Sequence, residues 1–238
     1  MRPPVVETPD VKVPATPVGS RFFKAVDRAG FDFHSGTVRW LPADGAPIPE
    51  GGWLVEHPKP GPIGAGSARG YLSSASVETD CTGFLWPARL LLVEPVGAMW
   101  TPHPDEFPRK RAAHAWRVVR ELPAWRLFGP QGRQVAAIIE QTAHLTSTQI
   151  EDLSDAWDAA QLAVRVDARL AAYDATCGSA RLVAYGTARD TALGAAQLAV
   201  LGAVRDVVIG WLVKDLISVE DFRTLTGPWE QVVGRVIA

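Results

Sequence analysis

Short apolar runs recur along the first half of the chain, each bounded by glycine, proline or aspartate. Runs of this length that are rich in Val, Phe and Trp are typical of β-strands. They are RFFKAVD (21–27), GTVRWL (36–41), GGWLVEH (51–57), ARLLLVEPVGAMW (88–100) and AHAWRVVREL (113–122). The segment RLLLVEPVG suits a central strand, whereas SSAS (73–76) suits a turn or a strand edge. AHAWRVVREL has the length of a three-turn helix, but the flanking Pro108 and Pro123 favour a strand.

Beyond residue 130 the apolar positions follow a helical spacing instead. QGRQVAAIIEQTAHL (131–145) predicts one helix. A second opens at Thr146, where Gln149 stands at the spacing of a capping box, and it runs toward Gly178 as its C-cap residue.

The rest of the chain predicts two further helices. One spans roughly residues 179–216. The other begins near Ser218 and Asp221, which suggest an N-cap, and Gly227-Pro228 predicts a break in it.

Glycines recur every eight residues in this region, at positions 178, 186, 194, 202 and 210. Each eight-residue step advances about 80° around a helix, so the glycines spiral round the axis and do not line one face. We therefore expect no glycine zipper. Because each glycine weakens a helix by about 1 kcal/mol relative to Ala, packing on neighbouring elements must hold this segment.

Proline placement divides the chain. Eighteen of the nineteen prolines lie in residues 1–130, and the remaining one is Pro228. Because proline lacks an amide donor and clashes inside a helix, long helices are expected only beyond Pro130. We predict an α+β protein with an extended or disordered arm (1–19), a small Pro- and Trp-rich β-domain (20–128) and an α-helical segment (131–238), formed as a hairpin or small bundle.

Composition is that of a globular protein, with 47% hydrophobic and 21% charged residues. Cys81 and Cys177 form neither a disulfide framework nor a metal-type spacing. No apolar run of the signal-peptide kind opens the chain, and the most apolar stretch (193–213) carries Arg205 and Asp206 in its middle. We expect a cytoplasmic protein without a membrane span.

The glycine-rich stretch HPKPGPIGAGSARGYLSS (57–74) has part of the spacing of a phosphate-binding loop. Gly61 and Gly66 match G-x-x-x-x-G, but Ser67 stands where that loop has its lysine. The stretch therefore predicts a surface loop, in which Lys59 and Arg69 are the candidates for holding an anion.

His34, Tyr71 and Glu94 form the candidate catalytic set, each beside or within a predicted strand. The order His, Tyr, Glu on successive strands resembles the pattern of ADP-ribosyltransferases. That resemblance implies that His34 and Tyr71 would hold the nicotinamide ribose and that Glu94 would stabilise the oxocarbenium ion. Only 23 residues separate Tyr71 from Glu94, fewer than that family has between the two positions.

The segment EFPRKRAAHAWRVVR (106–120) interleaves basic residues with an aromatic one, a pattern that can contact nucleic acid or a protein partner. Its candidate contact residues are Arg109, Lys110, Arg111 and Trp116. Residues 1–130 carry fifteen Lys or Arg and thirteen Asp or Glu, a net of +2, and the remainder carries nine against thirteen, a net of −4. This balance argues against a general nucleic-acid binder.

Other familiar chemistry is missing from the sequence. The five histidines show no metal-ligand spacing, and no G-x-S-x-G serine motif occurs. We therefore expect no metal and no cofactor.

Several blocks resemble a two-part protein family of actinobacteria and their phages, one to which no activity is assigned. They are FFKAVDRAGFDFHSGTVRW (22–40), DCTGFLWPARLLLVEPVG (80–97), RVVRELP (117–123) and VKDLISVEDFRTLTGPW (213–229). The resemblance implies a β-rich part followed by Ala-rich helices, in a phage or mobile-element protein made inside the bacterial cell.

The leading functional hypothesis is a non-enzymatic adaptor or host-interaction protein that binds a macromolecule, with a host protein as its partner. The alternatives are an ADP-ribosyltransferase-like enzyme and a structural virion component. Self-association would use the Ala-rich helical segment.

Overall fold

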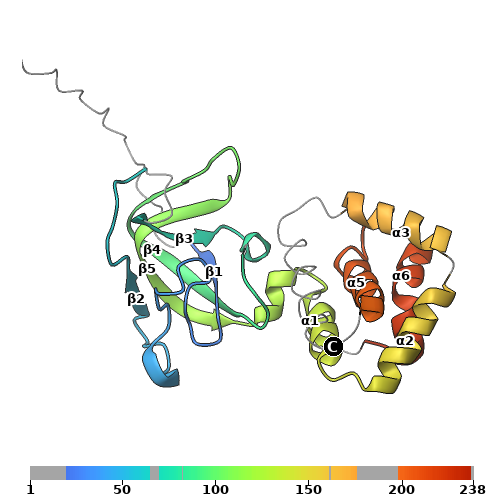
Figure 1. The fold of residues 1–238 in the computed structure, drawn as a ribbon. Helices are drawn as coiled ribbons and strands as arrows, with labels where there is room; N and C mark the ends of the chain where they lie inside the picture. Colours follow the sequence, from blue (N-terminus) through green and yellow to red (C-terminus); the bar gives the residue numbers. More distant parts are fainter. Residues whose placement is uncertain (1–19, 65–69, 82, 161, 176–197, 237–238) are drawn as a thin grey trace, which may run out of the picture.

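The computed structural model describes residues 20–64, 70–81, 83–160, 162–175 and 198–236 of the 238-residue chain. Its first half is a five-stranded antiparallel sheet and its second half is helical, which confirms the predicted α+β layout (Figure 1). Within the described ranges no α-helix precedes Gly129 and no strand follows it. The predicted arm, residues 1–19, lies outside them.

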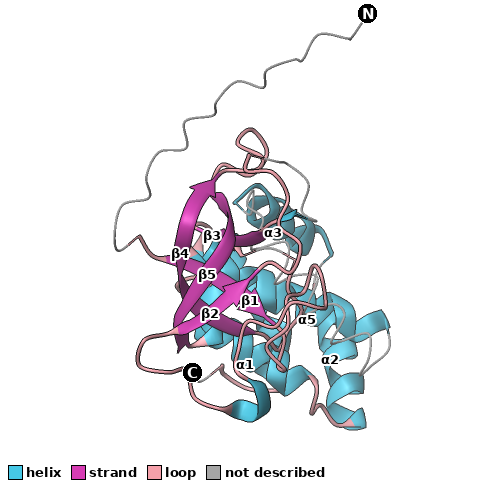
Figure 2. Ribbon diagram, turned by 90° about the vertical axis from the view of Figure 1, so that its left-hand side faces the viewer, coloured by secondary structure: helices cyan, strands magenta, loops and turns pink. Residues whose placement is uncertain are grey.

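The sheet closes on itself as a small barrel (Figure 2). Its strands are β1 (Phe22–Val26), β2 (Trp53–Glu56), β3 (Leu72–Ala75), β4 (Arg89–Trp100) and β5 (Lys110–Leu122). One edge of β5 pairs with β4 and the other pairs with β2 and β3, while β1 joins β3 to β4. Closure between β1 and β3 rests on a single register pair, Phe23 with Ala75.

Two register shifts bend the long β4–β5 hairpin around the barrel, between Leu92 and Val93 and between Val96 and Met99. The run that permitted either a helix or a strand, 113–122, belongs to β5. The polar run SSAS, expected as a turn or strand edge, contributes Ser73, Ser74 and Ala75 to β3.

The strand predicted at 36–41 is wrong. Arg39 forms only an isolated bridge, with Phe31. The segment folds back on itself, because Trp40 N–H donates to the Gly30 carbonyl at 2.7 Å, and Trp40 and Leu41 are buried inside the barrel. The apolar residues that indicated a strand therefore fill the barrel instead of extending its sheet.

Two sets of buried side chains hold the molecule together. One fills the barrel and includes Phe22, Trp40 and Trp116. The other starts on the outer face of the sheet with Leu90 and Leu92. It then passes through the short 3-10 helix η4 (Ala124–Phe128) into the helices. Two further 3-10 turns are η1 (Ala43–Gly45) and η3 (Glu78–Asp80).

The described helices are α1 (Gly132–Thr142), α2 (Ser147–Ala159), α3 (Leu162–Ala175), α5 (Leu198–Leu212) and α6 (Val219–Val232). The capping box of α2 is confirmed, since the Thr146 hydroxyl accepts from Gln149 N–H and the Gln149 side chain accepts from Thr146 N–H. The predicted C-cap Gly178 and most of the glycine series lie outside the described residues.

The long helix predicted from Thr146 toward Gly178 is instead two helices. Ala160 adopts an extended conformation and ends α2. Trp157 Nε1–H donates to the Asp206 carboxylate at 2.9 Å, and Arg169 donates to the same carboxylate at 2.7 and 2.8 Å. In one straight helix these donors would lie about 18 Å apart along the axis, so the chain must turn between them.

The predicted break at Gly227-Pro228 is also wrong, because α6 continues through Pro228 to Val232. A residue before proline is normally excluded from helical conformation by contact between its Cβ and the proline ring. Gly227 has no Cβ, and Leu225 and Trp229 are buried on either side. The predicted N-cap is confirmed, since the Ser218 hydroxyl accepts from Asp221 N–H at 3.0 Å.

The described glycines of the eight-residue series pack against different neighbours. A Cβ at Gly202 would overlap the Trp157 ring of α2, and one at Gly210 would lie 3.2 Å from Leu225 and Thr226 of α6. This agrees with the expected spiral and with a helix held by its neighbours. None of the described helices has the length and apolar character needed to cross a membrane.

Candidate functional site

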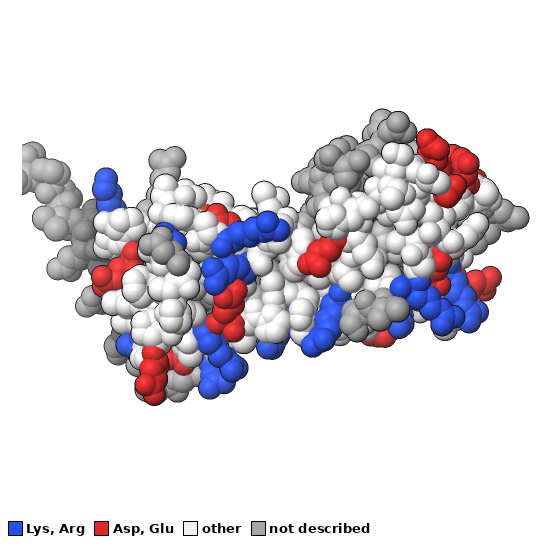
Figure 3. Space-filling model, turned by 90° about the horizontal axis from the view of Figure 1, so that it is seen from below, with Lys and Arg blue, Asp and Glu red and all other residues white. Residues whose placement is uncertain are grey.

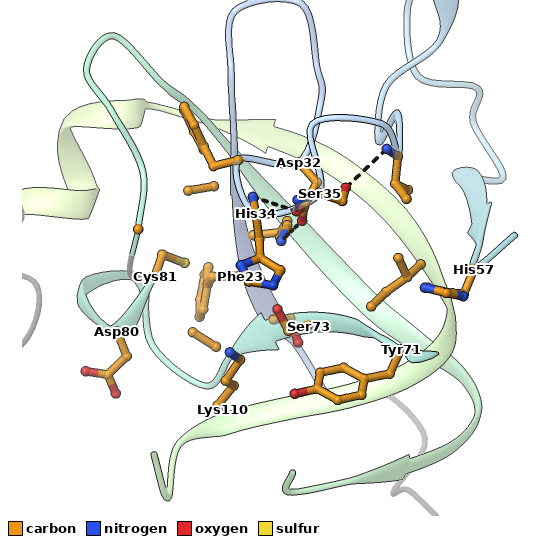
Figure 4. Close-up of a pocket in the computed structure, with 18 residues that line it drawn as sticks. Phe23, Asp32, His34, Ser35, His57, Tyr71, Ser73, Asp80, Cys81 and Lys110 are labelled. Carbon is orange, nitrogen blue, oxygen red and sulfur yellow. Dashed lines mark hydrogen bonds and ion pairs between the residues drawn. The ribbon is translucent and has the colours of Figure 1, made fainter. Parts of the chain in front are cut away.

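A pocket of about 300 Å³ opens where β1 and β3 separate on either side of their single register pair. Its walls come from β1, β3, the start of β5 and the loop 32–38, with His57 at one side (Figure 4). Figure 4 shows the His34 imidazole, the Lys110 amine and the Tyr71 ring directed into this hollow from different sides.

A buried ion pair between Lys24 and Asp32 forms one wall. Lys24 shares the inward face of β1 with Phe22 and Val26, and its ammonium lies 5.0 Å from the centre of the Trp40 ring. Asp32 also accepts from the N–H groups of His34 and Ser35, both at 2.8 Å.

These contacts fix the charge of Asp32. Burial alone would raise the pKa of its carboxyl, but the charge and hydrogen bond of Lys24 and the two N–H donors outweigh burial. The pKa of Asp32 is therefore held below its ordinary value, and the residue stays ionised.

Lys110 enters the pocket from β5 without a carboxylate partner. Among the described residues it forms no ion pair, and its ammonium lies 5.7 Å from the centre of the Phe107 ring. Burial lowers the pKa of Lys110 and the charge of Lys24 lowers it further, while Asp32 and Glu106 act in the opposite direction.

Two buried hydroxyls complete the polar lining. Tyr71, which precedes β3, and Ser74 of β3 are each only 4% exposed, and neither hydroxyl has a hydrogen-bond partner among the described residues. Burial raises the pKa of the Tyr71 phenol, so it remains a neutral hydrogen-bond donor. The Tyr71 ring packs edge-on against Trp100, with 5.8 Å between ring centres.

The pocket brings together part of the predicted catalytic set. His34 and Tyr71 line it, whereas Glu94 does not. Glu94 stands on β4 at the register of Arg117 of β5. The described lining therefore offers His34 and Tyr71 without the glutamate that the ADP-ribosyltransferase pattern needs.

The predicted anion site on the glycine-rich loop is only partly described. Lys59 is exposed beside a shallower hollow that His34 and His57 also line, and Arg69 lies outside the described residues. Gly61 N–H donates to the Gly70 carbonyl at 2.9 Å, and a Cβ on either glycine would crowd the other. These two glycines close the base of the loop.

The predicted basic and aromatic surface is not one surface. Trp116 is fully buried in the barrel and donates from Nε1 to the Leu72 carbonyl at 3.1 Å, so it belongs to the core. Arg111 donates to the Pro108 carbonyl at 2.6 Å, and Arg109 is exposed and pairs with Asp80 at 3.4 Å. On the face in Figure 3, basic and acidic side chains are interspersed over the barrel.

Lys24, Asp32 and Ser74 were not recognised from the sequence as site residues. Lys24 carried a usable signal, because it interrupts the apolar run FFKAV at a position that alternation directs inward. No group of three or more His, Cys, Asp or Glu side chains in the described ranges could hold a metal ion.

Strand β2 carries exposed apolar side chains next to the pocket. Trp53 is 36% exposed and Leu54 is 48% exposed, and the residue after β2, His57, lines the pocket. β2 pairs only with β5, so its second edge meets no strand in the part of the chain that the structure describes.

Neither family models, nor curated proteins, nor solved structures gave a match to this chain.

Proposed function

We propose that this protein acts by binding another protein, and that strand β2 and the adjacent pocket form the recognition surface. The observation that carries the proposal is the exposure of Trp53 and Leu54 on a strand whose second edge meets no other described strand. An extended segment of a partner can hydrogen-bond to such an edge while apolar side chains bury against it.

Binding is favoured over catalysis because the candidate catalytic set is incomplete at the pocket. His34 and Tyr71 line the pocket without Glu94. The resemblance to actinobacterial and phage proteins adds the expectation that the partner is a protein of the bacterial host.

The test is site-specific photo-crosslinking in the cells that make the protein. A photoreactive phenylalanine analogue replaces Leu54 on β2 or His34 at the pocket, with exposed Glu140 on α1 as the matched control. We expect both Leu54 and His34 positions to capture the same protein and the Glu140 position to capture none. In the protein that carries the photoreactive residue at position 34, the further change Leu54→Glu should strongly reduce the yield of crosslinked partner, because it puts a charge among the exposed apolar side chains of β2.

Two outcomes contradict the proposal. One is capture that is equal at Glu140, or that is insensitive to Leu54→Glu. The other is NAD turnover by the purified protein that disappears on Glu94→Gln, which would favour the ADP-ribosyltransferase alternative.

A further inference from the structure

The charged groups around the pocket leave one positive charge uncompensated. Lys24 pairs with Asp32, and Asp80 pairs with Arg109. Lys110 is the remaining charged lining group, and it has no ion pair among the described residues. Lys110 therefore offers one positive charge that no described carboxylate pairs with, and a monoanion would match it.

The same pocket holds hydrogen-bond donors that the fold does not use. A buried hydroxyl without a hydrogen-bond partner destabilises the folded protein, and native proteins seldom retain one without a reason. Tyr71 and Ser74 both line the pocket, both are more than nine-tenths buried, and neither hydroxyl has a hydrogen-bond partner in the part of the chain that the structure describes. Such donors suit a ligand that only accepts hydrogen bonds.

We propose that this pocket binds a carboxylate, with the Lys110 ammonium as its counter-ion and the Tyr71 hydroxyl as a donor. A carboxylate carries one negative charge and about four lone-pair positions, so it matches the charge of Lys110 and accepts from both groups. A phosphate dianion would exceed the available positive charge. The inference rests on the proposed function in one respect, which is that the carboxylate belongs to an acidic side chain or chain terminus of the partner protein.

The first test is titration of the full-length protein with sodium acetate, followed by NMR, with sodium chloride at equal ionic strength as the reference. We expect saturable shifts of the amide signals of β3 and of Lys110 with acetate and not with chloride. Because a hydrogen bond to a charged group contributes about 1.5–3 kcal/mol, Lys110→Met should weaken acetate binding about tenfold or more. The matched control, Lys214→Met, removes an exposed lysine of the helical half and should leave the affinity unchanged.

Tyr71→Phe separates a binding role of the phenol hydroxyl from a structural one. If the hydroxyl serves a ligand, this change lowers acetate affinity while the unfolding midpoint without acetate stays equal to or above that of the unaltered protein. A lower midpoint with unchanged affinity would assign the hydroxyl to the fold and overturn its role in the site. Ser74→Ala is the matched control, because Ala75 is in register with Lys110 and Ser74 therefore lies on the other face of β3. Loss of the Ser74 hydroxyl should leave the acetate affinity unchanged.

Failures of the two proposals are distinguishable. The absence of saturable acetate shifts, or tighter binding of inorganic phosphate than of acetate, overturns the carboxylate site. Crosslinking to a partner that persists unchanged in Lys110→Met also overturns it and leaves the partner surface intact. A third outcome is that acetate binds, that peptides with a free terminal carboxylate do not compete with it, and that no partner is crosslinked. This outcome supports the carboxylate site and identifies the ligand as a small free acid.

Discussion

At the scale of single residues, Cys81 shows how burial determines the protonation state of a side chain at this site. The thiol is buried beside the pocket, and its burial raises the pKa of Cys81 from an ordinary value of 9.0 to about 12. The charge of Lys24 and a hydrogen bond from Ala25 act in the opposite direction without cancelling this effect. The folded protein therefore keeps Cys81 as a neutral thiol under conditions in which the unfolded chain forms a thiolate.

This difference predicts an alkaline loss of stability. As pH rises above 9.0 the unfolded chain loses a proton that the folded protein retains until about 12, so the free energy of unfolding falls through that window. For one group the slope approaches about 1.4 kcal/mol per pH unit. Cys81→Ala should remove this contribution, which urea unfolding of both proteins across the window would measure. Parallel pH profiles for the two proteins would contradict the assignment.

Sequence reasoning found part of the site at this scale. His34, Tyr71 and Lys110 were recognised because His, Tyr and Lys are residue types that carry chemistry, although Lys110 was grouped with the buried Trp116. Ser74 could not be recognised, because a serine in a polar run gives no sign that its hydroxyl is buried without a partner. That property depends on the barrel closing around β3.

At the scale of elements, local patterns predicted the strands and caps, and tertiary contacts decided the exceptions. Apolar runs located β1, β2, β4 and β5, and the Thr146 capping box located the start of α2. The turn between α2 and α3 could not be predicted, because it depends on Trp157 and Arg169 meeting at Asp206, far along the chain.

The contact between α5 and α2 predicts the effect of filling Gly202. Alanine favours a helix by up to about 1 kcal/mol over glycine, but its Cβ would overlap the Trp157 ring. Overpacking of this kind costs about 1–3 kcal/mol, so Gly202→Ala should lower the free energy of unfolding in a urea titration. In a Trp157→Leu background the same change should cost less or become stabilising. Equal effects in the two backgrounds would contradict the contact.

At the scale of the whole molecule, a shared core joins the barrel to the helices. Leu127 of η4 is fully buried in the set of side chains that includes Leu90 and Leu92 of β4 and Val135 and Ile138 of α1. The change at Pro130 from proline-rich to proline-poor sequence therefore marks a change of secondary structure across which packing continues.

Shared packing predicts that the two halves unfold together. Leu127→Ala should lower the free energy of unfolding by about 2–5 kcal/mol, because it leaves a cavity in that core. The urea midpoints reported by NMR signals of β5 and of α5 should coincide in the unaltered protein and move together in the variant. A shift confined to one half would show that the halves are independently stable.

The single register pair between β1 and β3 has a dynamic consequence. Few main-chain hydrogen bonds hold the barrel shut along that line, whereas β4 and β5 are paired over most of their length. Local opening is easiest where the fewest hydrogen bonds must break, so we expect the barrel to open transiently between β1 and β3. A ligand of the pocket would therefore enter and leave between β1 and β3, while the other strand pairs of the barrel stay hydrogen-bonded.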